Sequence, residues 1–460
     1  MKISSLKKWM TGLIGGAVLV LGTFATQAQS EFPLKEGDTW VMVGDSITAQ
    51  HLHSNYFEAF CYARFPKMTF CFRNSGIGGD TIPKVMDRFA WDVAHWDPTV
   101  VSVELGMNDK GQFATDKFME NMSSLVAKIR SVNARPVLLS ASPVNNGTPL
   151  VKMDSGNVRL KEYADALKAL AEKENIPYAD QFTSLVDLWA QNKPKENLAN
   201  QLVALRELLA AQPNLAGAEH AKEFLEVWNK MEKQPVTMMG DAVHPGPTGQ
   251  LTMAATLLAE LKAPGLVSSS TVDAKTGSAK DSVQCKMENV KISGDTLSFD
   301  RLDEALPFPI PDDARPAVTV LDSIANLSKY MLTVSGLKAD NYDVSIDGVK
   351  VATVSSAELA NGWNMGLLDK GPIAEQCRLI LQLVSAKEGV VWTWRGVSKA
   401  AAQGATQEQK DQLARLAAQV KEADGKIREA AKPKAHRFEL VPAKPAASIS
   451  CGPRTAGSPS

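Results

Sequence analysis

Three side chains of this sequence have the types that turn a hydroxyl into a nucleophile. Ser46 lies in a Gly-Asp-Ser sequence, and Asp241 and His244 stand three residues apart. A serine hydroxyl becomes reactive when an imidazole removes its proton, and a carboxylate beside that imidazole fixes its tautomer and stabilises its charged form. Residues three apart on a tight turn or a first helical turn lie on the same side. We therefore expect Ser46, His244 and Asp241 to form a catalytic triad.

Attack of a serine on a carbonyl creates an oxyanion, which needs hydrogen-bond donors that are already in place. The candidate donors are the backbone N–H groups of Ser46 and Gly79 and the side-chain amide of Asn108. The neighbouring carboxylates Asp45 and Asp109 are expected to accept hydrogen bonds from loop backbone. Taken alone, each of these short motifs is also typical of a turn or a helix cap. Their occurrence together is what indicates chemistry.

Short apolar runs precede these motifs and predict the strands that would position them. The runs alternate with helix-like stretches and occupy residues 39–43, 68–72, 99–105, 136–140 and 176–179. Alternating strands and helices predict a doubly wound parallel sheet, and ligands bind at the carboxyl edge of such a sheet. Three motifs follow strands and the fourth precedes a helix expected over 248–262, so this edge would gather them. Asp92 and His95 repeat the Asp-x-x-His spacing but precede the third strand, which predicts a place at the opposite edge.

On these motifs, residues 38–265 resemble the SGNH hydrolases, also called the GDSL esterase/lipase family. The Ser, Gly, Asn and His that name the family match Ser46, Gly79, Asn108 and His244 in the family's order, and Asp241 matches the third triad member. The resemblance implies a flavodoxin-like three-layer α/β/α sandwich with a five-stranded parallel sheet. It also implies hydrolysis of carboxylic esters without a metal or another cofactor.

The length of 460 residues favours two domains. We expect a signal peptide at 1–28, a hydrolase domain at 36–265 with a helical insertion at about 188–236, and a linker at 266–282. A C-terminal mixed β/α accessory region would follow at 283–441, with hairpin turns at 294–295 and 347–348 and a long helix at 408–431, before a disordered tail at 442–460. The linker and the tail are predicted from their composition, which is rich in Ser, Thr, Lys and Gly in the first and in Pro, Ala, Ser and Gly in the second.

Three features bear on compartment and partners. Lys2, Lys7 and Lys8 precede a short, glycine-interrupted apolar run, which favours a signal peptide over a permanent membrane anchor and predicts a secreted or periplasmic protein. Fifty basic and 51 acidic residues give a formal charge of −1, which provides no electrostatic footprint for nucleic acid. The five cysteines lack C-x-x-C spacing, so no zinc site is indicated. Cys61 and Cys71 either pair or remain buried free thiols.

The preferred function is an exported serine esterase that removes acyl groups, acetyl above all, from an acylated small molecule or polysaccharide. One alternative is a lipase or acyl (thio)esterase on lipid substrates, with the apolar insertion lining an acyl channel. Another is a non-catalytic glycan-binding module on the same fold. Four tryptophans could stack on sugar rings, although aromatic residues at helical spacing usually lie in the core; they are Trp91, Trp96, Trp189 and Trp228. The oligomeric state stays open.

Overall fold

The computed structural model describes residues 31–145, 152, 154–192, 196–230, 238 and 240–444. The expected signal peptide lies outside the described residues, and so does all but the first part of the expected tail, which is described to residue 444. Within the described ranges, no helix has both the length and the apolar character needed to cross a membrane.

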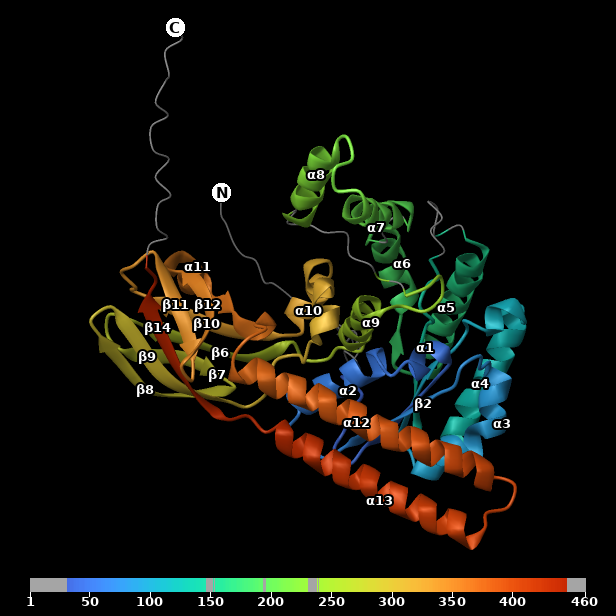
Figure 1. The fold of residues 1–460 in the computed structure, drawn as a ribbon. Helices are drawn as coiled ribbons and strands as arrows, with labels where there is room; N and C mark the ends of the chain where they lie inside the picture. Colours follow the sequence, from blue (N-terminus) through green and yellow to red (C-terminus); the bar gives the residue numbers. More distant parts are fainter. Residues whose placement is uncertain are drawn as a thin grey trace, which may run out of the picture.

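A five-stranded parallel sheet forms the centre of the N-terminal unit (Figure 1). The strand order β2-β1-β3-β4-β5 is that of the flavodoxin-like doubly wound fold, so the expected fold class is confirmed. The strands are β1 (Thr39–Gly44), β2 (Cys71–Gly76), β3 (Val100–Glu104), β4 (Arg135–Leu139) and β5 (Tyr178–Ala179).

Helices cover both faces of this sheet. On one face, α2 (His53–Arg64) and α9 (Pro247–Glu260) pack against Trp40 and Met42 of β1. On the other face, Val41 and Val43 of the same strand pack against helices that follow β2, β3 and β4. These helices are α3 (Ile82–Asp92), α4 (Thr115–Ser131) and α5 (Ser155–Glu174). Because both faces are covered, the central strands are apolar without alternation. The chain between β5 and α9 contains α6 (Gln181–Asn192), α7 (Glu196–Ala211) and α8 (Ala218–Lys230).

Beyond α9 the chain forms two further sheets. The first has the order β13-β10-β6-β7 and the second has the order β12-β11-β14-β9-β8. The two expected hairpin turns join β8 to β9 and β11 to β12. The strands are β6 (Leu266–Asp273), β7 (Ser278–Val283), β8 (Cys285–Ser293), β9 (Thr296–Asp303), β10 (Lys329–Ser335), β11 (Asn341–Ile346), β12 (Val349–Ser355), β13 (Trp363–Asn364) and β14 (Ala435–Pro442); the short helices are α10 (Asp322–Asn326) and α11 (Ser356–Asn361). One apolar cluster runs through both units, and Phe60 of α2 packs edge-on against Phe308 at 5.2 Å between ring centroids.

The prediction of a linker at 266–282 is wrong, because the segment forms strands and two of its serines, Ser268 and Ser270, are buried in β6. Arg301 of β9 donates hydrogen bonds to Ser268 Oγ at 2.7 Å and to Ser270 Oγ at 3.0 Å. Ser268 in turn donates to Asp303 at 2.6 Å. A polar composition indicated exposure to solvent, but buried polar groups are stable when they are hydrogen-bonded. The segment therefore forms β6 and β7 instead of a flexible connection.

Two long helices, α12 (Pro372–Ala401) and α13 (Gln407–Ala430), form a hairpin beside β2 (Figure 1). The sequence predicted the second of these helices but not the first. β2 is an edge strand of the parallel sheet, and the hairpin supplies polar partners to its open side. Lys387 and Arg395 donate to the carbonyl oxygens of Phe72 and Gly76, each at 2.9 Å, and Glu388 accepts from the N–H of Asn74 at 3.3 Å.

The same hairpin explains why β2 begins later than expected. The apolar run at 68–72 predicted a strand there, whereas the strand is Cys71–Gly76 and includes three polar residues, Arg73, Asn74 and Ser75. Arg73 is buried, and its guanidinium pairs with Asp424 of α13 at 2.7 Å. A charge is stable in a buried strand only with such a partner. Because Asp424 lies 351 positions further along the chain, the local pattern could not reveal it.

Lys387 holds two buried carboxylates. Its ammonium lies 2.6 Å from Glu58 of α2 and 2.6 Å from Glu388. Burial alone would lower the pKa of Lys387, but the two negative charges outweigh burial and raise it. The ammonium therefore stays protonated in the interior and links α12 to the α/β unit.

We expect Lys387→Met to lower the free energy of unfolding by about 3–5 kcal/mol, because Glu58 and Glu388 would lose their buried counter-charge. Urea unfolding followed by circular dichroism measures this change. Lys426→Met is the matched control, since the ion pair of Lys426 with Glu422 on α13 is solvent-exposed and should contribute little to stability. Equal losses in the two variants would contradict the buried role of Lys387.

Candidate active site

Ser46, His244 and Asp241 lie in one hydrogen-bonded line. Ser46 Oγ is 2.9 Å from His244 Nε2, and His244 Nδ1 is 2.9 Å from Asp241 Oδ2. The serine and the histidine are 198 positions apart in sequence, so the fold alone brings them together. In this geometry Nε2 can accept the hydroxyl proton while the carboxylate holds Nδ1–H. The structure thus places the three predicted triad residues in mutual contact.

Ser46 is placed by the sharp turn between β1 and α1 (Ser46–Ala49). Asp45 Oδ1 accepts the N–H of Ile47 at 2.9 Å, so Asp45 caps α1 through its side chain, as expected. Gly44, before the turn, has no room for a side chain, because a Cβ there would lie 1.9 Å from Thr48 Oγ1. The Gly-Asp-Ser sequence therefore has a structural reason for each of its residues.

Asp241 is fixed by the backbone of its own turn. Its Oδ1 accepts the N–H groups of Val243 and His244, both at 2.7 Å, while Oδ2 faces the His244 ring. The hydrogen bond from the His244 N–H is the main cause that lowers the pKa of Asp241 to about 2. The Asp241 and His244 side chains are 61% and 35% exposed, so this end of the triad is open to solvent. Asp241 is therefore a carboxylate at any pH above mild acid.

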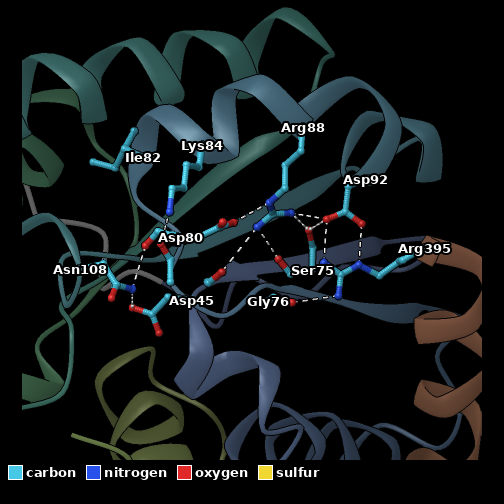
Figure 2. A network of polar contacts seen from close by, with 12 residues as sticks. Asp45, Ser75, Gly76, Asp80, Ile82, Lys84, Arg88, Asp92, Asn108 and Arg395 are labelled. Carbon is cyan, nitrogen blue, oxygen red and sulfur yellow. Dashed lines mark hydrogen bonds and ion pairs between the residues drawn. The ribbon is translucent and has the colours of Figure 1, made fainter. Parts of the chain in front are cut away.

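The turn that carries Gly79 runs beside the nucleophile, and Asn108 contacts that turn. A Cβ on Gly78 would lie 3.9 Å from Ser46 Cβ, so the turn at 76–80 runs beside Ser46. Gly79 has φ +75°, a conformation that favours glycine. Asn108 Nδ2 donates to the Asp80 carbonyl at 2.9 Å and lies 3.4 Å from Asp45 Oδ2 (Figure 2). The structure thus brings the Gly79 turn and Asn108 to the same side of the site as Ser46.

A match to a protein-family model covers part of the chain that forms this site. Residues 42–201 match the model of the GDSL-like lipase/acylhydrolase family. The matched segment is an SGNH hydrolase domain. It contains Ser46, Gly79 and Asn108, whereas Asp241 and His244 lie beyond the matched residues. This match supports carboxylic ester hydrolase activity of the GDSL type.

The fold also occurs among solved structures. The structure of "BT4096 a gut microbial diltiazem-metabolizing enzyme" has 22% sequence identity and a TM-score of 0.69, and the alignment covers 90% of this chain and 99% of that one. A catalytic mutant of Axe2, an acetylxylan esterase from Geobacillus stearothermophilus, has 18% identity and a TM-score of 0.36 over 50% of this chain and 95% of that one. None of the curated proteins matches the chain. The first alignment extends well beyond the SGNH hydrolase domain, so the combination of parallel sheet and C-terminal region occurs in another protein.

A buried ionic network joins the ends of the turn at 76–80 of the SGNH hydrolase domain to α3 (Figure 2). Arg88 of α3 donates to Asp80 Oδ2 and to the carbonyl of Ser75, both at 2.7 Å, and also contacts Asp92. Asp92 accepts from Ser75 Oγ at 2.8 Å, near the carboxyl end of β2. The prediction that Asp92 lies at the amino edge is therefore wrong, because its ion pairs hold it inside the domain. His95, its partner in the Asp-x-x-His spacing, is exposed.

A buried pair of an acid and a base, Glu104 and His53, was not predicted from the sequence. His53 Nε2 lies 3.0 Å from Glu104 Oε2, and His53 Nδ1 lies 2.6 Å from Gln250 Oε1. Burial lowers the pKa of His53, but the charge and hydrogen bond of Glu104 outweigh it, so the pKa is raised. Both ring nitrogens face acceptors, which fits an imidazolium. The one available signal was Glu104 itself, a lone charge inside the apolar run at 99–105.

The structure also describes the residues considered above for metal binding, disulfide formation and sugar stacking. The described part of the chain contains no group of three or more His, Cys, Asp and Glu side chains suited to a metal ion. Cys61 and Cys71 are both free thiols; Cys61 is buried, as the second alternative expected, whereas Cys71 is half-buried. Trp189 is fully buried, and its indole N–H lies 3.3 Å from Thr252 Oγ1, so this tryptophan belongs to the core.

Asp45 is the carboxyl group next to the nucleophile, and it is 3% exposed. Burial raises its pKa to about 7, although the hydrogen bond from Ile47 acts against this, and Glu104 and Asp109 add to the rise. In the unfolded chain this carboxyl loses its proton near pH 4. Between about pH 4 and 7 the folded state therefore binds more protons than the unfolded state, and stability falls as pH rises.

We expect Asp45→Asn to remove this pH dependence. The free energy of unfolding of the variant relative to the wild type should rise with pH by up to about 1.4 kcal/mol per unit between pH 4 and 7. Urea unfolding of both proteins at several pH values measures the difference. A difference that stays constant across this range would contradict a protonated, buried Asp45.

Proposed function

We propose that this chain is an exported serine esterase in which Ser46 is the nucleophile, His244 the general base and acid, and Asp241 the residue that orients His244. The observation that carries the proposal is the hydrogen-bonded line from Ser46 Oγ through His244 to Asp241, with both distances at 2.9 Å. Each contact is short enough for a proton to pass or be held along it.

In the first half of the reaction, Ser46 Oγ attacks the acyl carbonyl while its proton passes to His244 Nε2. The oxyanion that forms would receive hydrogen bonds from the N–H groups of Ser46 and Gly79 and from the amide of Asn108. An amide carries two N–H donors. One of them points to the Asp80 carbonyl at 2.9 Å, and the longer contact to Asp45 at 3.4 Å is the one an oxyanion would replace.

The first half ends when the leaving alcohol takes the proton from His244 and the acyl group stays bound to Ser46. In the second half His244 removes a proton from water, whose oxygen attacks the acyl carbon. The bond from the acyl carbon to Ser46 Oγ then breaks, Ser46 takes the proton back from His244, and the acid leaves. Because the backbone N–H groups around Asp241 lower its pKa to about 2, Asp241 stays a carboxylate and stabilises the imidazolium in both halves.

Carbohydrate that carries acetyl groups is the substrate class we propose. The N-terminal lysines and apolar run favour export, which brings the enzyme to glycans outside the cytoplasm. The exposed Asp241 and His244 support a substrate whose bulk remains in solvent. The buried apolar side chains of α7 and α8 pack against one another, as Leu209 and Leu225 do, instead of lining an acyl channel. The enzyme whose structure aligns over most of the chain is described as metabolising diltiazem, so small molecules belong in the same test.

Removal of the nucleophile should abolish turnover. We expect Ser46→Ala to lower kcat for an aryl acetate by about 10⁶-fold. Asp241→Asn should lower kcat by about 10⁴-fold, because it favours the wrong tautomer of His244. Ser131→Ala and Asp116→Asn, at exposed positions of α4, are matched controls that should retain wild-type turnover. If the wild type left every aryl ester intact, the non-catalytic binding alternative would replace the esterase.

The length of the acyl group distinguishes deacetylation from lipid hydrolysis. We expect kcat/KM for p-nitrophenyl esters to fall by about tenfold or more from acetate to octanoate, because a site for acetyl has no room for the added methylenes. Release of acetate from acetylated xylan and from small acetyl esters, measured in parallel, ranks the two substrate classes. A rise in kcat/KM with chain length would favour the lipase alternative.

A further inference from the structure

Helix α12 of the C-terminal hairpin lies along β2, an edge strand of the parallel sheet. Residues 72, 74 and 76 of β2 direct backbone groups to the open edge, and α12 meets each of them with a charged side chain. These side chains are Lys387, Glu388 and Arg395, and the last two lie seven residues apart, which is about two helical turns. They therefore project from one side of α12 along the direction of β2.

Arg395 makes the contact nearest to the active site. It is 4% exposed, and its Nη1 donates to the carbonyl oxygen of Gly76 at 2.9 Å. Its Nε and Nη2 pair with the two oxygens of Asp92 at 2.6 and 2.8 Å. Such a two-pronged ion pair fixes the plane of the guanidinium, which a lysine cannot reproduce. Arg395 thus holds one particular carbonyl in one orientation.

Gly76 is the first residue of the turn that carries Gly79. It packs so closely on α1 that a Cβ at Gly76 would lie 2.5 Å from the backbone nitrogen of Ala49. The far end of the turn is held by Arg88, which donates to Asp80 Oδ2 at 2.7 Å. Both arginines share the carboxylate of Asp92 (Figure 2). The turn is therefore clamped at both ends, and its position relative to Ser46 depends on a residue from the C-terminal hairpin.

We propose that Arg395 is a positioning residue for the oxyanion donors, and that the active site of this esterase is complete only with the C-terminal hairpin in place. The proposal rests on the proposed function, since it assigns a role within that same site. Arg395 acts through the Gly76 carbonyl and Asp92 and does not contact the substrate. It sets the place of the Gly79 N–H and, through the Asp80 carbonyl, the orientation of the Asn108 amide.

Arg395→Lys tests this role while it keeps the charge and removes the two-pronged contact. Loss or displacement of a single oxyanion donor lowers turnover by about 10²–10³-fold, so we expect kcat for an aryl acetate to fall by about 10–10²-fold with KM within about twofold of wild type. Arg395→Met should lower kcat further. Urea unfolding of each variant reports whether it is folded under the assay conditions.

The matched control is Asp424→Asn. It breaks the other buried arginine-carboxylate pair between the hairpin and β2, that of Arg73 with Asp424, which lies before the turn and not at it. We expect this variant to lose stability and to keep kcat within about twofold of wild type, because loss of a buried pair is a cost to folding. If Arg395→Lys kept wild-type kcat, or if Asp424→Asn lowered kcat as much as Arg395→Lys did, the proposal would be overturned.

A double-mutant cycle with Asn108→Ala adds a readout that a merely structural role would not move. If Arg395 acts by positioning this donor, the fold-losses of the two single variants should multiply to more than the loss of the double variant. If the loss in kcat of the double variant equalled the product of the two single-variant losses, the proposal would be overturned. A wild type without esterase activity would instead refute the proposed function, whereas an active wild type with an equally active Arg395→Lys variant would refute the positioning role alone.

Discussion

The open edge of β2 is the constraint on which the rest of the structure depends. A backbone N–H or C=O that is buried must find a hydrogen-bond partner, and a strand at the edge of a sheet lacks a neighbour that could supply one. In this protein α12 supplies the partners through charged side chains. Each buried charge then needs a counter-charge, which Lys387 finds in Glu58 and Arg395 finds in Asp92. The C-terminal region is consequently part of the interior of the α/β unit and shares its core.

Asp241 and Asp45, two aspartates of the active-site region, show how environment decides the role of a carboxylate. Asp241 is exposed and surrounded by backbone N–H groups, which lower its pKa to about 2. Asp45 is buried, which raises its pKa to about 7 despite a hydrogen bond from Ile47. The first stays charged and can stabilise an imidazolium, while the second caps a helix and is only partly ionised at neutral pH. Burial and hydrogen bonding separate the two groups, although both are aspartates.

The sequence predicts what depends on local pattern and on order along the chain. The parallel sheet followed from apolar runs, and the meeting of Ser46 with His244 followed from the rule that ligands bind at the carboxyl edge. What it missed depends on distant partners. The serines of β6 indicated a linker because the sequence did not reveal Arg301 as their hydrogen-bond partner. The start of β2 was misplaced because Arg73 is charged and its partner, Asp424, is 351 positions away. In the sequence alone, Lys387 and Arg395 are typical of the solvent-exposed face of a helix. Their contacts with β2 become visible only in the folded structure.

A charged helix solves a problem at this edge that neither an apolar helix nor another strand would solve. An apolar helix would leave the carbonyls of Phe72 and Gly76 buried without donors, at about 1–3 kcal/mol each. Another strand would pair with them but would expose a new edge of its own, open to pairing with further chains. The contacts with β2 are made by the long side chains of lysine, glutamate and arginine, which reach from the helix to the backbone of the strand. The sheet therefore ends at β2, and the carbonyl that starts the Gly79 turn is oriented from outside the SGNH hydrolase domain by a side chain that the minimal domain does not contain.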